Sequence, residues 1–198
     1  MCYISIIYDS LQSRTMNTPF SEKASIMLLT STEEGKYVLE ALKAQPEYFR
    51  DKKILNVGAG VVDLERILLE KGVDADVTSL DLNYNPRRKS VLWNLVLKAT
   101  RKQYPPHSIQ ADMTEMPFED QSFDISISTS SLLEWVEADR AVVAFKEICR
   151  VTKHEVLVAP YSPNNNPNLV NLLSSNVGEN FNISTPDNTM IKLTRKIK

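Results

Sequence analysis

The sequence predicts an α/β fold: a doubly wound, mostly parallel seven-stranded sheet closed by an antiparallel C-terminal hairpin. Three observations lead to this prediction. A strand pattern, a glycine turn and a helix pattern follow one another over residues 53–72. Strand and helix patterns then alternate as far as residue 160, with crossovers long enough for parallel pairing. Two alternating segments around residues 185–189 have the form of a hairpin.

The region before the first strand divides into two parts. Residues 1–18 follow no clear period, and we expect a loose, disordered arm there. Residues 19–198 would form a single domain. Its first part, 19–50, contains two expected helices, the second opening at Ser31-Thr-Glu-Glu. These helices precede the core at 51–198 and are placed to cover its ligand pocket.

The first strand ends at Gly58 and Gly60, and a helix pattern begins at Leu64. Glycine lets a backbone approach a ligand closely, and a helix start offers N–H groups to a carboxylate or phosphate. A dinucleotide is disfavoured, because Asp63 stands where that fingerprint has glycine or alanine. No Gly-Lys-Ser/Thr follows Gly58, which excludes a P-loop. The turn therefore favours a cofactor that carries a carboxylate and a cation but no phosphate.

The remaining elements follow in alternation, and the carboxyl ends of the parallel strands meet at one edge, where such sheets bind ligands. We expect strands at 76–81, 108–112, 123–128, 156–160, 180–184 and 190–194, and helices at 86–102 and 138–151.

Acidic residues follow the second and third strands at this edge. Asp81 ends the second strand, where a carboxylate suits a ribose diol, and it is our best single binding residue. Asp112-Met113 follows the third strand. Asp63 has two interpretations, a favourable charge at the helix dipole or a cofactor contact.

Composition narrows the functional classes. The chain has 198 residues, 42% of them hydrophobic, and a formal charge of −2, so we expect one core and no nucleic-acid partner. No apolar run reaches the roughly 18 residues that span a bilayer. Its two cysteines, Cys2 and Cys149, indicate no disulfide scaffold, and we expect a cytoplasmic protein. His107 and His154 form no metal-binding pattern.

Four segments resemble the class I S-adenosylmethionine-dependent methyltransferases, particularly the small-molecule branch that includes ubiquinone and menaquinone biosynthesis enzymes. Among them, the stretch Ala111-Asp-Met-Thr-Glu-Met-Pro-Phe-Glu-Asp-Gln-Ser-Phe-Asp124 is the most specific. The resemblance covers about residues 53–160 and implies a Rossmann-like methyltransferase fold. The segments are 54–62, 79–83, 111–135 and 145–153.

The resemblance also implies a cofactor site for S-adenosylmethionine. The glycine turn would lie beneath the methionine part and Asp81 would hold the ribose. Asp112 would pair with the adenine amino group, Met113 would line the adenine, and Thr129 and Ser130 would lie beside the sulfonium. The predicted cofactor-binding set is Gly58, Ala59, Gly60, Asp63, Asp81, Leu82, Asp112, Met113 and Thr129.

The chain departs from the family pattern at three places. The family usually has an acidic residue at Asn56 and a third glycine at Val62. Asp63 is a candidate substitute carboxylate. Residues 152–155 replace the Pro-Gly-Gly turn common before the fifth strand, and we expect an altered surface turn there.

These observations support a methyltransferase that acts on a small-molecule acceptor. The changes at Asn56 and Val62 keep open a second hypothesis, a cofactor-binding or regulatory protein that has lost turnover. A third is an enzyme that modifies RNA or protein. Ser128-Thr-Ser-Ser131 lacks the Asn/Asp-Pro-Pro-Tyr pattern of enzymes that methylate nucleobase nitrogens, which disfavours that substrate. Neither the acceptor, a catalytic base nor the oligomeric state is predicted.

Overall fold

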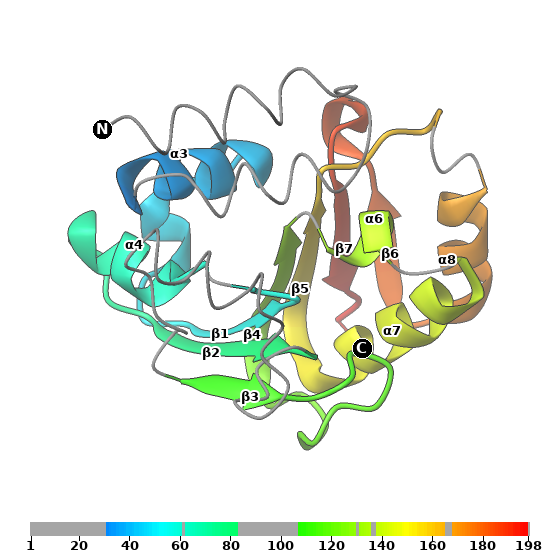
Figure 1. Cartoon of the computed structure of the whole chain (residues 1–198). Coiled ribbons are helices and arrows are strands. Elements are labelled where there is room, and N and C mark those ends of the chain that lie inside the picture. Colours follow the sequence, from blue (N-terminus) through cyan, green and yellow to red (C-terminus); the bar gives the residue numbers. More distant parts are fainter. Residues whose placement is uncertain are drawn as a thin grey trace, which may run out of the picture.

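The computed structural model describes residues 31–60, 62–82, 107–129, 131–135, 138–164 and 168–197. These residues contain a seven-stranded sheet in the order β3-β2-β1-β4-β5-β7-β6 (Figure 1). All pairings are parallel except those of β7, which is antiparallel to both β5 and β6. The predicted doubly wound, mostly parallel sheet with an antiparallel hairpin is confirmed. The expected arm at 1–18 and the expected helix at 86–102 lie outside the described residues.

The strands are β1 (Lys53–Val57), β2 (Asp76–Asp81), β3 (Ser108–Gln110), β4 (Phe123–Thr129), β5 (Thr152–Ala159), β6 (Phe181–Ser184) and β7 (Ile191–Arg195). The α-helices are α3 (Ser31–Ala41), α4 (Leu64–Glu70), α6 (Leu132–Trp135), α7 (Ala138–Val151) and α8 (Leu169–Val177). Two short 3-10 helices are η1 (Pro46–Phe49) and η2 (Pro186–Asn188).

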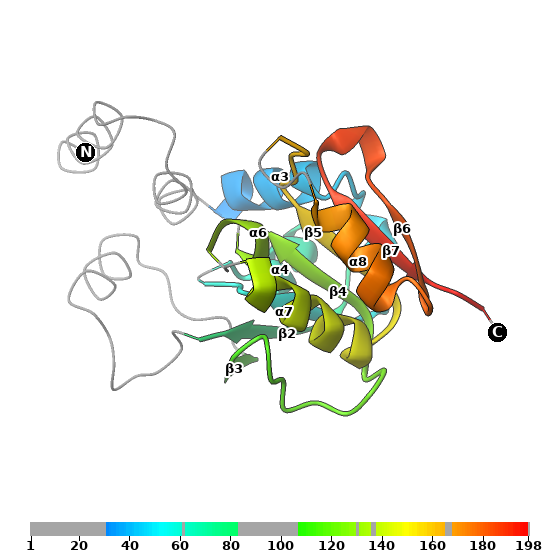
Figure 2. The same ribbon diagram turned by 90° about the vertical axis from the view of Figure 1, so that its right-hand side faces the viewer.

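Helices cover both faces of the sheet, α3 and α4 on one side and α7 and α8 on the other (Figures 1 and 2). Neighbouring residues of β1 accordingly enter different hydrophobic clusters. Ile54 packs in the cluster that contains Ile67 of α4, and Leu55 packs in the cluster that contains Phe145 of α7. A strand buried on both faces has a nearly continuous apolar sequence, which explains why residues 54–57 are apolar except for Asn56.

The expected surface turn at residues 152–155 is wrong, because β5 begins at Thr152 directly after α7. The Thr152 hydroxyl donates to the Ile148 carbonyl at 2.5 Å and lies 2.6 Å from the Ser126 hydroxyl, so it joins the helix end to β4. A register shift between Phe123 and Ile125 of β4 accompanies this early start. The departure from the family pattern thus changes the sheet itself.

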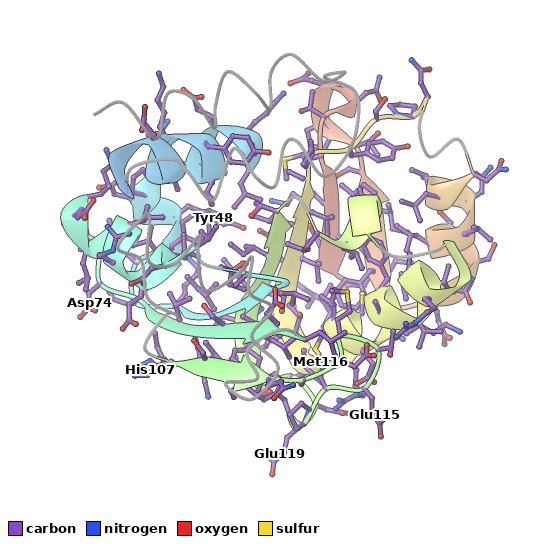
Figure 3. All side chains as sticks on the ribbon, in the orientation of Figure 1. Tyr48, Asp74, His107, Glu115, Met116 and Glu119 are labelled. Atoms are coloured by element: carbon purple, nitrogen blue, oxygen red, sulfur yellow. The ribbon has the colours of Figure 1, made fainter. Side chains whose placement is uncertain are left out.

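The segment before β1 is tied to the sheet through Tyr48 of η1 (Figure 3). The Tyr48 hydroxyl donates to the Glu155 carboxylate of β5. Glu155 also pairs with the Lys192 ammonium at 2.9 Å, and that ammonium lies 5.8 Å from the centre of the Tyr48 ring. This contact holds the chain that leaves α3 against β5 and β7.

The connection from β3 to β4 lies along α7 and is fastened there by Arg150. The Arg150 guanidinium donates to Glu147 and Asp120 and to the carbonyls of Met116 and Phe118, at 2.8 to 3.1 Å. The Met116 amide in turn donates to Glu147 at 2.9 Å. Arg150, with help from this amide, holds the pKa of the Glu147 carboxyl below its usual value. Met116 is part of this connection, and its side chain is buried in the hydrophobic cluster that contains Phe145 (Figure 3).

Replacing Arg150 with methionine is expected to lower the free energy of unfolding by about 2 kcal/mol, because several charge-assisted hydrogen bonds are lost and Glu147 keeps its charge without its partner. Urea denaturation of the variant measures the change. Lys146→Met is the matched control, since it removes one positive charge from an exposed position of the same helix. Equal stabilities of the two variants would contradict the role given to Arg150.

Candidate functional site

The glycine turn after β1 is held by backbone and side-chain groups at the end of β2. Gly58 and Gly60 have φ angles of +66° and +57°, a region that favours glycine. The amides of Gly58 and Ala59 donate to the Leu80 carbonyl at 2.7 and 3.1 Å. The Gly60 amide donates to the Asp81 carboxylate at 2.9 Å, and Asp81 is only 4% exposed. Asp81 therefore shapes the turn as well as lying beside it.

Ser131, which follows β4, lies against the same turn. Its hydroxyl donates to the Val57 carbonyl at 3.1 Å and lies 2.7 Å from the Ser128 hydroxyl. A Cβ built on Gly58 would lie 2.3 Å from the Ser131 Oγ atom. The sequence alone assigns no role to Ser131. The one feature that marks it is its place in the run of hydroxyl residues 128–131 at the end of the fourth strand. Ser131 closes the turn on one side.

The connection after β3 reaches the turn through Met113. Its Cε atom lies 3.6 Å from the position that a Cβ built on Gly58 would take. Beside it, both carboxylate oxygens of Asp112 are engaged. Oδ1 accepts from the amide and hydroxyl of Thr114 at 2.9 and 2.7 Å, and Oδ2 accepts from Arg140 at 2.7 Å. The Thr114 hydrogen bonds, joined by Arg140, hold the pKa of the Asp112 carboxyl below its usual value.

The other predicted residues lie around the same edge. Asp63 caps α4, since its carboxylate accepts from the Arg66 amide at 3.1 Å, which fits the first of its two interpretations. Leu82 is 58% exposed, and its carbonyl accepts from the Gln110 side chain at 3.2 Å. Thr129 ends β4 and is half-buried. The structure thus brings the ends of β1, β2, β3 and β4 together, while the cofactor contacts themselves stay predictions.

Asn56, one of the departures from the family pattern, lies in β1 just before the glycine turn. Asn56 is 1% exposed, and among the residues that the structure describes neither its amide nitrogen nor its amide oxygen has a hydrogen-bond partner. Such groups are rare in folded proteins and call for a ligand, a water or another explanation. Val62, in contrast, is 7% exposed and packs in the hydrophobic cluster shared with α4.

Several further residues follow the fourth and fifth strands and deserve a check as site residues. Tyr161 is 6% exposed and belongs to the cluster on the α7 side, so it serves as a core residue. Ser130 and the side chains of Glu134 and Trp135 are not described. Within the described ranges, no group of three His, Cys, Asp or Glu side chains is arranged to hold a metal ion. No helix in those ranges is long and apolar enough to cross a membrane.

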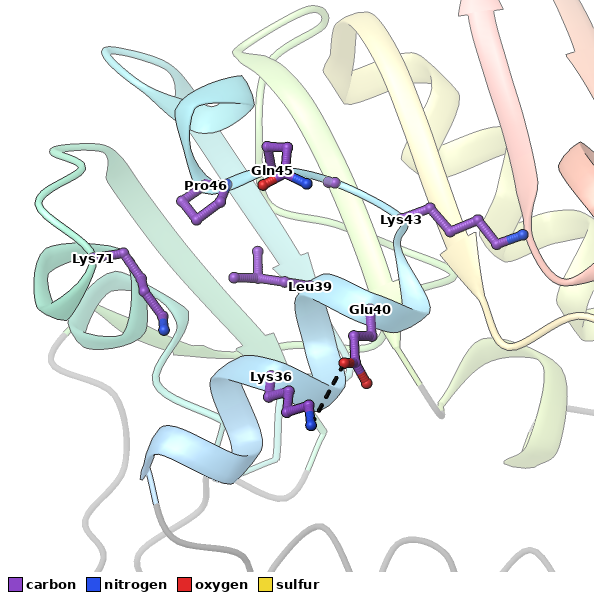
Figure 4. Close-up of a pocket in the computed structure, with 8 residues that line it drawn as sticks. Lys36, Leu39, Glu40, Lys43, Gln45, Pro46 and Lys71 are labelled. Atoms are coloured by element: carbon purple, nitrogen blue, oxygen red, sulfur yellow. Dashed lines mark ion pairs between the residues drawn. The ribbon is translucent and has the colours of Figure 1, made fainter.

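A separate hollow of about 650 Å³ lies between α3, the connection to η1 and the end of α4 (Figure 4). Lysines line it, and none of the predicted cofactor residues does. Lys36 pairs with Glu40 at 3.9 Å, and Lys43 pairs with Asp187 at 2.6 Å. The hollow is therefore distinct from the edge that carries the glycine turn.

The comparisons with known proteins agree with this geometry. A family model described as a methyltransferase domain matches residues 55–159 of the 198-residue chain. The match runs from β1 to the end of β5 and includes the glycine turn, Asp81 and Asp112. No curated protein matches the chain significantly.

Solved structures share the fold at low sequence identity. The magnesium protoporphyrin IX methyltransferase from Synechocystis with bound SAM is 13% identical, with a TM-score of 0.56 over 98% of this chain and 97% of that one. A SAM-dependent methyltransferase from Aquifex aeolicus is 14% identical, with a TM-score of 0.54 over 88% and 96%. The ribosomal protein L11 methylase from Lactobacillus delbrueckii subsp. bulgaricus is 14% identical, with a TM-score of 0.51 over 84% and 79%. The named acceptors differ, so the shared fold leaves the acceptor open.

Proposed function

The chain belongs to the methyltransferase-domain family, and we propose that it transfers the methyl group of S-adenosylmethionine to a small-molecule acceptor. Family membership makes the chain a methyltransferase, and neighbours with bound SAM or SAH support S-adenosylmethionine as its cofactor. The small-molecule class, in the branch that includes quinone-biosynthesis enzymes, rests on the resemblance of residues 111–135. We further place the enzyme in the cytoplasm, on its cysteine pattern.

The single observation that carries the cofactor proposal is the buried, unpartnered carboxamide of Asn56 beside the glycine turn. A carboxamide has an NH2 group that donates and a carbonyl oxygen that accepts, which suits an amino-acid end that has both a carboxylate and an ammonium group. A Cβ on Gly60 would meet no described atom within 4 Å, so the turn has open space at Gly60. These groups fit S-adenosylmethionine, with Asn56 and the turn at the methionine end and Asp81 at the ribose.

When bound, S-adenosylmethionine supplies a methyl group that its sulfonium has already activated. The protein then has to align the acceptor with that methyl group and exclude water. In our proposal, Asp81 binds the ribose of S-adenosylmethionine and the glycine turn lies beneath its methionine end. The connection after Thr129 lies beside the sulfonium and its methyl group. We assign no general base.

Transfer from radiolabelled S-adenosylmethionine tests the proposal. The purified protein is incubated with three fractions of a cell extract, namely small molecules, RNA and protein. Binding of S-adenosylmethionine and S-adenosylhomocysteine is measured beside it by calorimetry. We expect micromolar binding and label in the small-molecule fraction.

The other outcomes are equally informative. Label in RNA or protein would overturn the acceptor class. Binding without transfer to any fraction would favour the second hypothesis, a cofactor-binding protein without turnover, which the changes at Asn56 and Val62 keep open. Absence of binding would remove the cofactor proposal as a whole.

A further inference from the structure

The candidate site contains an ion pair between Arg140 and Asp112. Arg140 stands in the first turn of α7 and Asp112 in the connection after β3. Their side chains meet with an Nη2 to Oδ2 distance of 2.7 Å. Both remain open to water, with 57% and 35% of the side chain exposed. A ligand that reaches this edge therefore meets a carboxylate that already has a cationic partner.

The orientation of Asp112 does not depend on Arg140. Thr114 holds the other oxygen with two hydrogen bonds, one from its amide and one from its hydroxyl. The connection is also fastened to α7 at its far end by Arg150 and Glu147. Arg140 thus occupies the one oxygen of Asp112 that Thr114 does not engage.

We propose that Arg140 is a selectivity-determining residue at the purine end of the cofactor site. This inference rests on the proposed function, in which Asp112 accepts from the adenine amino group. An amino-purine must share Oδ2 with Arg140, which weakens its hydrogen bond to the carboxylate. A purine with a carbonyl oxygen in that position accepts from Arg140 instead. The pair therefore narrows the difference in affinity between amino- and oxo-purine ligands.

The test compares two ligands by calorimetry on the full chain and on Arg140→Met. S-adenosylhomocysteine carries the amino group, and S-inosylhomocysteine has a carbonyl oxygen there. We expect the ratio of their affinities to favour the amino ligand about threefold more in the variant, the size expected for an exposed ion pair. High salt should move the wild-type ratio in the same direction, because it screens the pair.

Matched variants separate selectivity from a structural effect. Lys146→Met removes a charge from an exposed position of the same helix and should leave the ratio unchanged. Arg140→Lys should retain part of the wild-type ratio. If Arg140→Met alters both affinities equally or not at all, the inference fails while the proposed function stands. If the wild type binds neither ligand, the proposed function fails first.

Discussion

Replacing Asp81 with alanine is expected to weaken the binding of S-adenosylhomocysteine by more than about tenfold, on the order of 1.5 to 3 kcal/mol. Two effects combine in this loss. The proposed charge-assisted hydrogen bonds to the ribose disappear. The Gly60 amide, which donates to Asp81 at 2.9 Å, also loses its partner, so the turn beneath the methionine end is no longer held. Calorimetric titration measures the affinity of both proteins.

Two further variants separate these effects. Asp81→Asn keeps an acceptor for the Gly60 amide but loses the charge, and we expect an affinity between those of the wild type and the alanine variant. Asp76→Ala removes an exposed carboxylate from the opposite end of β2 and should bind normally. An Asp81→Ala variant with wild-type affinity would mean that the ribose lies elsewhere.

The position of the site was predictable because it depends on strand ends alone. Once the alternation of strands and helices is known, the carboxyl ends of parallel strands must share an edge. That rule brings Gly58, Asp81 and Asp112 together without any knowledge of side-chain contacts. The Met113 contact with the turn agrees with it. The two-sided burial of β1 is reflected in its sequence, because the residues after Lys53 are apolar except for Asn56.

Contacts between distant residues were not predictable, because nothing local encodes them. Ser131 reads as one hydroxyl in a polar run, and only the fold places it on Gly58. Arg140 reads as a solvated charge on a helix, although it pairs with a residue 28 positions away.

Two local features also escaped the sequence analysis. Helix α8 carries serine and asparagine side chains that bond back to carbonyls four residues earlier, a composition typical of turns. The early start of β5 depends on the Thr152 hydroxyl, which bonds to both α7 and β4.

The largest loss of stability is expected from Gly58→Ala, about 3 kcal/mol in the free energy of unfolding. A positive φ angle of +66° costs alanine about 1 kcal/mol. The new Cβ would also lie 2.3 Å from Oγ and 2.5 Å from Cβ of Ser131, so Ser131 must move and lose its bonds to Val57 and Ser128. Overpacking of this kind typically adds about 1 to 3 kcal/mol. Urea denaturation measures the total.

Gly72→Ala is the control that isolates the clash with Ser131. Gly72 has a similar φ of +74°, but a Cβ there would meet nothing within 4 Å. The control should therefore lose only the conformational part, about 1 kcal/mol. Adding Ser131→Gly to Gly58→Ala removes both clashing atoms and should recover part of the remaining loss, whereas Ser131→Ala keeps the Cβ and should recover less. If Gly58→Ala and Gly72→Ala are equally stable, Ser131 does not close the turn, because a clash is expected only with Ser131 and only at Gly58.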